Sequence, residues 1–155
     1  MCIKIINMIE NKLLKLLIIY TLSYFTVTTI FVYLLNLPQL VTNDKKGLIK
    51  YYYVKNFVNV IVFDYFLIMF YLLFNNWLIS TFNVKSLFGK IIINIIGTIL
   101  ISGSFMIYFL NKPYNKNSFF SKWFYSVKWK AVVYDILLIL LCFILIKMIY
   151  YKIND

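Results

Sequence analysis

Two aspartates, Asp64 and Asp135, are the residues whose type and setting most suggest chemistry, because each lies a few residues into a long apolar run. A carboxylate within a membrane span is costly and typically faces a partner, a cavity or an ion pathway. If the two carboxylates share one site, they could relay protons or bind a cation. The structural alternative is that each is stabilised near its helix N-terminus and pairs with Lys55, Lys128 or Lys130. The sequence leaves both interpretations open.

The elements that must position these carboxylates are apolar runs of membrane-spanning length. The chain is 63% hydrophobic and 14% charged, whereas about one quarter of the residues of a soluble domain are charged. A span needs about 20 apolar residues, and the runs that reach this length are 16–37, 57–79, 91–110 and 131–150. Backbone polar groups in lipid must be satisfied within each segment, which favours helices. We therefore predict an all-α membrane protein, a four-transmembrane-helix bundle that forms one membrane domain over residues 1–155.

The two halves of the chain carry similar patterns. Tyr-x-Leu-Asn-x-Pro occurs at 33–38 and again at 108–113, and an aromatic stretch bounded by lysines follows each copy. Each half then reaches an apolar run with one aspartate near its start. The pattern predicts two tandem helix-loop-helix repeats, 13–80 and 88–155. Units with an even number of crossings keep one orientation, so we expect a pseudo-two-fold axis along the membrane normal.

Aromatic residues and lysines are concentrated before the second and fourth runs. Tyrosine and tryptophan favour the headgroup layer, and lysines near the surface attract anionic lipids. The expected interfacial anchors are Lys50, Tyr51, Tyr52, Tyr53, Lys55, Lys122, Trp123, Phe124, Tyr125, Lys128 and Trp129. We interpret them as a belt that sets helix depth or, in the sharper alternative, as a surface that binds lipid or a protein partner.

Polar residues within the runs predict which helix faces turn inward. They recur at helical spacing and so form stripes along the first three runs. The expected polar seam consists of Thr21, Tyr24, Thr28, Tyr71, Asn75, Asn94, Thr98 and Ser102. Gly97 and Gly103 lie beside the third stripe and would let another helix approach closely. The alternative to a functional seam is ordinary helix packing, in which interhelical hydrogen bonds contribute about 0.6 kcal/mol each.

The net charge of +11 comes from lysines that lie mostly in tails, loops and run borders. This placement favours a bilayer with anionic headgroups as the partner and excludes nucleic acid. The loops 38–56 and 111–130 hold nine lysines and the opposite side holds seven. The positive-inside rule therefore weakly favours a cytoplasmic location for these two loops.

The residue types argue against catalysis. Without histidine the chain lacks an imidazole base and the commonest metal ligand, and it has no Gly-rich phosphate loop. Cys2 and Cys142 are far apart in the sequence and predict neither a disulfide nor a redox pair. We expect no enzymatic activity, no cofactor and no metal.

The chain combines four apolar runs and an A/T-rich codon composition with the contexts Val-Phe-Asp at Asp64 and Val-Tyr-Asp at Asp135. In these features it resembles uncharacterised multi-pass membrane proteins of large A/T-rich DNA viruses. The resemblance implies a host-membrane or virion-membrane location and carries no activity. From the residues, the favoured function is a non-enzymatic structural or partner- or lipid-interacting membrane component, as a homo-oligomer or with other membrane proteins. The alternative is a small proton- or cation-coupled carrier or channel that uses the aspartate pair.

Overall fold

The computed structural model describes residues 2–43 and 47–154, and long helices dominate both parts. In chain order the elements are α1 (Cys2–Thr28), η1 (Thr29–Leu34), α2 (Leu37–Thr42), α3 (Leu48–Lys50), η2 (Tyr51–Lys55), α4 (Phe57–Thr81), α5 (Leu87–Leu110), α6 (Phe119–Val127) and α7 (Trp129–Asn154). η1 and η2 are π-helical turns, in which the backbone N–H groups bond five residues back and the helix is wider than an α-helix.

Four helices are long and apolar enough to cross a membrane. They cover Lys12–Leu34, Phe57–Thr81, Leu87–Leu110 and Trp129–Ile153. The first of these combines most of α1 with η1, so the helix crosses the membrane through a π-turn. This confirms the four predicted helices, and the chain is a multi-pass membrane protein by helix length and composition.

Local backbone chemistry moves several helix ends from their predicted positions. The first span ends at Leu34 because Asn36 adopts a left-handed conformation with a φ of 49°. Pro38, directly after the predicted run 16–37, lies in the first turn of α2, where its missing N–H is tolerated. α5 begins at Leu87 rather than at residue 91, because the Ser86 hydroxyl caps it by accepting a hydrogen bond from the Gly89 N–H at 3.0 Å.

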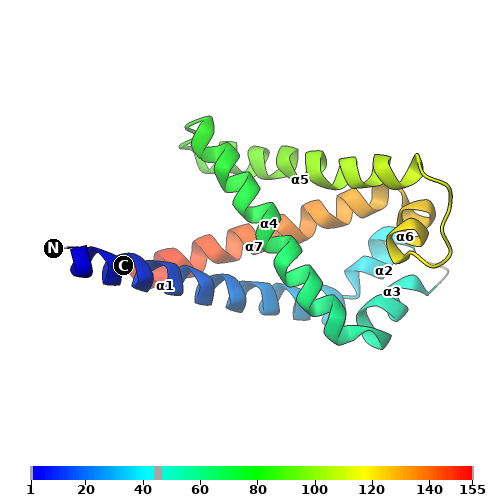
Figure 1. Cartoon of the computed structure of the whole chain (residues 1–155), viewed down its shortest axis with the longest axis horizontal. Helices are drawn as coiled ribbons and strands as arrows, with labels where there is room; N and C mark the ends of the chain where they lie inside the picture. Colours follow the sequence, from blue (N-terminus) through cyan, green and yellow to red (C-terminus); the bar gives the residue numbers. More distant parts are fainter. Residues whose placement is uncertain (1, 44–46, 155) are drawn as a thin grey trace.

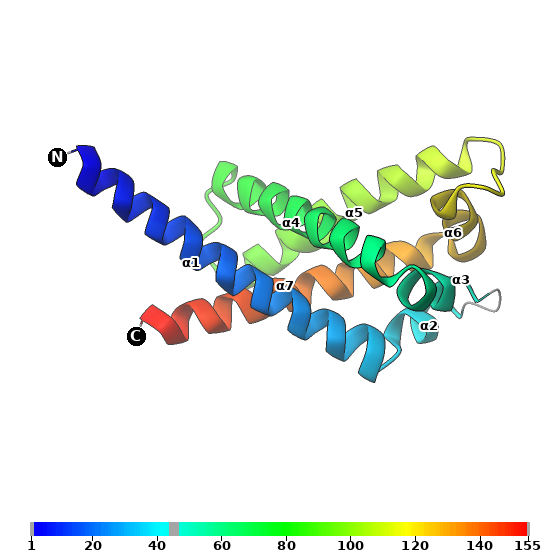
Figure 2. The same cartoon turned by 60° about the horizontal axis from the view of Figure 1, so that its bottom comes forward.

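The long helices form a bundle whose two ends differ in character. The short helices α2, α3 and α6 gather at one end, and both chain ends lie at the other, near the connection between α4 and α5 (Figures 1 and 2). α7 is the central helix: α1 and α5 pack along it, and α4 crosses it and packs against α5. The short helices of the two long loops therefore share one end of the bundle, and the side of the membrane that this end faces stays a prediction.

The two halves of the chain share only a coarse order of a long helix, short helical segments and a second long helix. The first half has α2, α3 and the π-turn η2 between its two spans, whereas α6 is the short helix of the second half. α5 packs closely along α7, but α1 and α4 meet mainly through side chains. The tandem duplication and its pseudo-two-fold axis therefore stay predictions.

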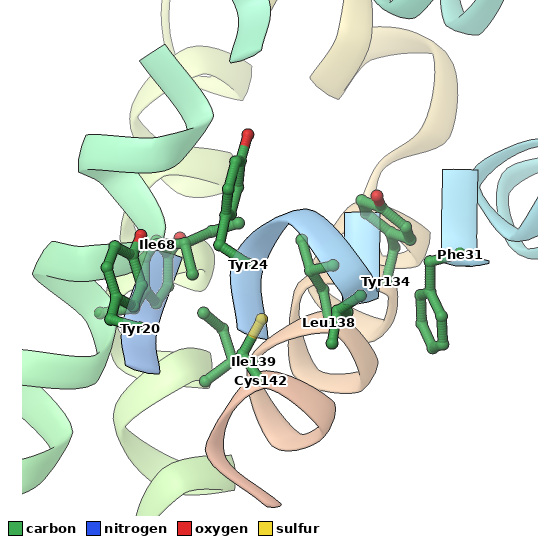
Figure 3. Close-up of a cluster of buried hydrophobic side chains, with 10 residues drawn as sticks. Tyr20, Tyr24, Phe31, Ile68, Tyr134, Leu138, Ile139 and Cys142 are labelled. Atoms are coloured by element: carbon green, nitrogen blue, oxygen red, sulfur yellow. The ribbon is translucent and has the colours of Figure 1, made fainter. Parts of the chain in front are cut away.

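Two tyrosines of α1 join this helix to α4. The Tyr24 hydroxyl donates to the backbone oxygen of Ile61 at 3.0 Å, and the Tyr20 hydroxyl donates to the backbone oxygen of Tyr65. Both donors and both acceptors are four residues apart, which is about one helical turn. Both tyrosine side chains are buried in the main apolar cluster, beside residues of α7 such as Ile139 (Figure 3). A buried hydroxyl in lipid needs an acceptor, so this tyrosine ladder fixes the register of α1 against α4.

Candidate functional site

A cavity of about 290 Å³ lies between α4, α5 and α7, and residues of α3, η2 and α6 border it at the end of the bundle that carries the short helices. The lining contains both aspartates that the sequence singled out. The other lining side chains are four tyrosines (Tyr52, Tyr53, Tyr71, Tyr134), seven further aromatic residues (Phe63, Phe105, Phe109, Phe119, Phe120, Trp123, Phe124) and five aliphatic residues (Ile49, Leu67, Ile68, Leu138, Ile139). We call this site the carboxylate cavity.

Asp64 lies in the second turn of α4 and is half-buried. The Tyr52 hydroxyl of η2 donates to the Asp64 Oδ1 atom at 2.8 Å. Burial and, after it, the Asp64 carboxylate raise the pKa of Tyr52 above its ordinary value, so this hydroxyl keeps its proton and remains a donor. The Tyr52 ring also stacks on Phe119 of α6, with the ring centroids 4.1 Å apart. Asp64 is therefore held by a tyrosine whose position depends on α6.

Asp135 occupies the corresponding turn of α7 and is also half-buried. The Ser102 hydroxyl of α5 donates to the Asp135 Oδ2 atom at 2.5 Å, and Ser102 is buried. The donors to both aspartates are thus neutral hydroxyl groups. Among the described residues that line the cavity, none is a lysine. The expected pairing with Lys55, Lys128 or Lys130 is therefore replaced by hydroxyl donors, because the helix packing turns both carboxylates toward the cavity.

A tyrosine pair completes the polar part of the lining. The hydroxyl oxygens of Tyr53 in η2 and Tyr134 in α7 lie 3.2 Å apart, and both side chains are buried. Burial, followed by the neighbouring Tyr134 and Asp64, raises the pKa of Tyr53. The π-turn of η2 lets two consecutive side chains, Tyr52 and Tyr53, both reach inward, since successive residues of a wider helix are separated by a smaller angle.

The predicted polar seam is largely buried, but it divides between two helix pairs. Every one of its eight residues except the half-buried Thr21 is buried. On α4 and α5 the stripe runs from the Asn75 and Asn94 side chains, which are joined at 3.1 Å, to Ser102 at the cavity. The α1 residues face α4 instead: the Thr21 hydroxyl lies 2.8 Å from that of Tyr65, and Tyr24 belongs to the tyrosine ladder.

The expected interfacial anchors fall into three groups. Lys50, Tyr51, Lys55, Lys128 and Trp129 are exposed, and Tyr52, Lys122, Trp123 and Tyr125 are half-buried. Tyr53 and Phe124 are buried, so their side chains pack within the bundle rather than face the headgroups. For Phe124 the reason is that the aromatic side of α6 packs inward, where its ring stacks on that of Phe109 at 5.6 Å. The role of the exposed residues at the membrane surface stays a prediction.

Sequence reasoning missed most of the cavity wall. The residues before the two aspartates, Phe63 and Tyr134, line the site together with them, and the recurring aromatic-aspartate pair is the signal that could have identified them. Tyr52 and Tyr53 were visible only as members of an aromatic and lysine stretch, whose composition is that of an ordinary interfacial belt.

The described residues hold no group of three or more His, Cys, Asp or Glu side chains close enough to bind a metal ion in the usual way. The carboxylate cavity instead combines two acidic groups with hydroxyls and aromatic rings, which is the lining of a site for a small molecule or a cation. Comparison of the chain with protein-family models, with curated proteins and with solved structures finds no match.

Proposed function

We propose that this multi-pass membrane protein binds a cation in the carboxylate cavity, with Asp64 and Asp135 as the counter-charges, and that it acts without catalysing a covalent step. This is the binding step that a small proton- or cation-coupled carrier requires. The observation that carries the proposal is that aspartates from two different helices line one cavity and accept hydrogen bonds from hydroxyls rather than from lysines.

Charge balance is the physical basis of the proposal. An isolated carboxylate in apolar surroundings is costly unless it is paired or protonated. The hydrogen bonds to the two aspartates come from hydroxyl groups, and a carboxylate offers about four lone-pair sites, so acceptor capacity remains toward the cavity. Such a site is stabilised most by a bound cation, or by protons that occupy the carboxylates until a cation displaces them.

A purely structural role for the two aspartates has less support. A structural carboxylate in a span is expected to pair with a basic side chain. Lys50, Lys55 and Lys128 are exposed, Lys122 and Lys130 are half-buried, and none of these five lysines lines the cavity. A role for the aromatic residues of α6 as a surface for partners is also weakened, because Phe119, Phe120 and Trp123 line the cavity.

Carbodiimide labelling in native-like membranes tests the proposal. Dicyclohexylcarbodiimide is apolar and reacts with protonated carboxyl groups, so it should label Asp64 and Asp135, as read by mass spectrometry of the peptides. Sodium, potassium, tetramethylammonium and choline are then added in turn. We expect at least one of these cations to protect both aspartates in parallel, while labelling of Glu10, which lies outside the four spans, stays constant.

Two outcomes would contradict the proposal. If no cation protects either aspartate, the cavity is not a cation site. If only one of the two aspartates is protected, the carboxylates do not act on a common ligand.

A further inference from the structure

We propose that the ligand of the carboxylate cavity is an organic cation, a substituted ammonium or phosphonium ion with apolar groups, which reaches the cavity from the lipid between α4 and α5. The inference rests on the proposed function and specifies its ligand class. It is carried by the size of the cavity, by the composition of its wall and by the position of its outer side.

The oxygen atoms of the lining are poorly arranged for a dehydrated hard inorganic cation. Hard cations such as Ca²⁺ and Mg²⁺ are held by about six or more oxygen ligands at 2.0–2.6 Å. The cavity measures about 290 Å³, and its oxygen atoms come from two carboxylates and four tyrosine hydroxyls dispersed over η2, α4 and α7. Two of these hydroxyls, those of Tyr53 and Tyr134, already bond to one another. Hydrogen bonds among these groups occupy part of their lone pairs, so the lining suits a hard ion less well than a cage of free oxygens would.

The wall of the cavity suits a cation with an apolar surface. Eleven of its 18 lining residues are aromatic, and aromatic faces attract quaternary ammonium groups through the ring quadrupole. Phe119 stacks on both Tyr52 and Trp123, so the rings at the α6 side form a continuous surface beside Asp64. A charged centre near the carboxylates and apolar groups against these rings would satisfy both parts of the lining.

The outer side of the cavity lies toward the lipid. α4 and α5 meet near their connection and diverge toward the end that carries α6 (Figure 1). On this side the cavity is bordered by Phe63 of α4 and Phe105 of α5, each 45% exposed on the outer surface of the bundle. An aromatic ring can move aside without breaking a hydrogen bond, so these two residues mark the route of access.

The charge of the bundle end favours the same route. Lys50 of α3, Lys55 of η2 and Lys128, directly after α6, are exposed, and these short elements lie at the end of the bundle that carries the cavity. A cation that approaches from water meets these ammonium groups, whereas a cation already dissolved at the membrane interface reaches Phe63 and Phe105 directly. Only a cation with apolar groups partitions into that layer. The route of access therefore also favours an organic cation as the ligand.

Tryptophan fluorescence provides a direct test. The chain has three tryptophans, of which Trp123 lines the cavity, while Trp77 and Trp129 are 58% and 61% exposed. The double substitution Trp77→Phe and Trp129→Phe leaves Trp123 as a single reporter. The probe is benzyltrimethylammonium, and its matched control is neopentylbenzene, which has the same shape with carbon in place of the charged nitrogen.

We expect benzyltrimethylammonium to change the Trp123 fluorescence saturably. Neopentylbenzene should bind at least about tenfold more weakly, because a close pair of opposite charges contributes at least that factor. Asp64→Asn and Asp135→Asn should each weaken binding of the ammonium probe by a similar factor. Equal binding of the two probes to the unaltered reporter protein would overturn the inference even if both aspartate variants fail to fold.

The remaining outcomes separate this inference from the proposed function. If sodium or potassium protects the aspartates from carbodiimide and benzyltrimethylammonium neither protects them nor changes the fluorescence, the cation site stands and the organic class is wrong. If no cation has either effect, both proposals fail. If binding of the probe requires the aspartates but its association rate is unchanged when Phe63 and Phe105 are both replaced by leucine, which leaves Trp123 as the single reporter, access through the lipid side is wrong.

Discussion

The contact between α4 and α5 predicts opposite effects for two glycine substitutions on the same helix. A Cβ atom at Gly97 would lie 1.9 Å from the Asn75 Oδ1 atom and 3.2 Å from the Leu78 Cδ1 atom. At Gly103 no atom lies within 4 Å of the added Cβ. Asn75 is 0% exposed, and its side-chain amide donates to the Asn94 Oδ1 atom at 3.1 Å. The Asn75 side chain can therefore yield to Gly97→Ala only by leaving this bond.

The magnitude follows from three contributions. Overpacking a filled site costs about 1–3 kcal/mol, and the interhelical hydrogen bond adds about 0.6 kcal/mol. Replacing glycine by alanine within a helix stabilises the helix by about 1 kcal/mol. We therefore expect Gly97→Ala to lower the free energy of unfolding by about 0.5–2.5 kcal/mol and Gly103→Ala to raise it by up to about 1 kcal/mol.

Reversible unfolding in mixed detergent micelles, followed by far-ultraviolet circular dichroism, measures both variants. A double-mutant cycle with Asn75→Ala provides the control, because removing the Asn75 amide should make room for the new methyl group and reduce the cost of Gly97→Ala. If Gly97→Ala is as stable as Gly103→Ala, α4 does not approach α5 at this point. The packing that brings Asp64 and Asp135 into one cavity would then be wrong as well.

Three further side chains can be tested by the same unfolding measurement. Ser23→Ala removes a buried hydroxyl without a hydrogen-bond partner among the described residues, so stability should rise by up to about 1 kcal/mol; a clear loss would show that this hydroxyl is bonded. Tyr24→Phe shortens the tyrosine ladder and should cost about 0.6 kcal/mol, whereas no loss would mean that packing alone sets the register of α1. Tyr52→Phe removes the donor to Asp64 and should cost about 1–2 kcal/mol; Tyr51→Phe, at a side chain that is 52% exposed, should leave stability unchanged, and equal losses would contradict the bond.

The spans could be predicted from sequence because length and hydropathy alone dictate them. A run of about 20 apolar residues has few alternatives to a membrane helix, and all four runs are helical. The exact ends depend on single residues: the left-handed Asn36 ends the first helix early, and the Ser86 cap starts α5 early. Such effects depend on local backbone conformation, which the hydropathy pattern does not contain.

The candidate site was predictable in its acidic part and in two residues of its polar part, Tyr71 and Ser102, which helical spacing placed in the expected polar seam. An aspartate within an apolar run stands out at once, so Asp64 and Asp135 were identified, but their hydroxyl partners depend on which helix faces meet. Tyr52 could not be distinguished from Tyr51 by composition, although one bonds to Asp64 and the other is exposed. Distinguishing the two tyrosines requires knowledge of the π-turn of η2 and of the packing of α6, which the composition does not contain.

The most direct test of the cation site is the affinity of the Trp123 reporter protein for benzyltrimethylammonium, compared with the same protein carrying Asp64→Asn, Asp135→Asn or both. Because a close pair of opposite charges at an interface contributes at least about 1.5 kcal/mol, each single substitution should raise the Kd at least about tenfold. The double substitution should abolish saturable binding. A double variant that folds, as judged by circular dichroism, and still binds the probe with the original Kd would contradict the assignment of Asp64 and Asp135 as the counter-charges of a cation.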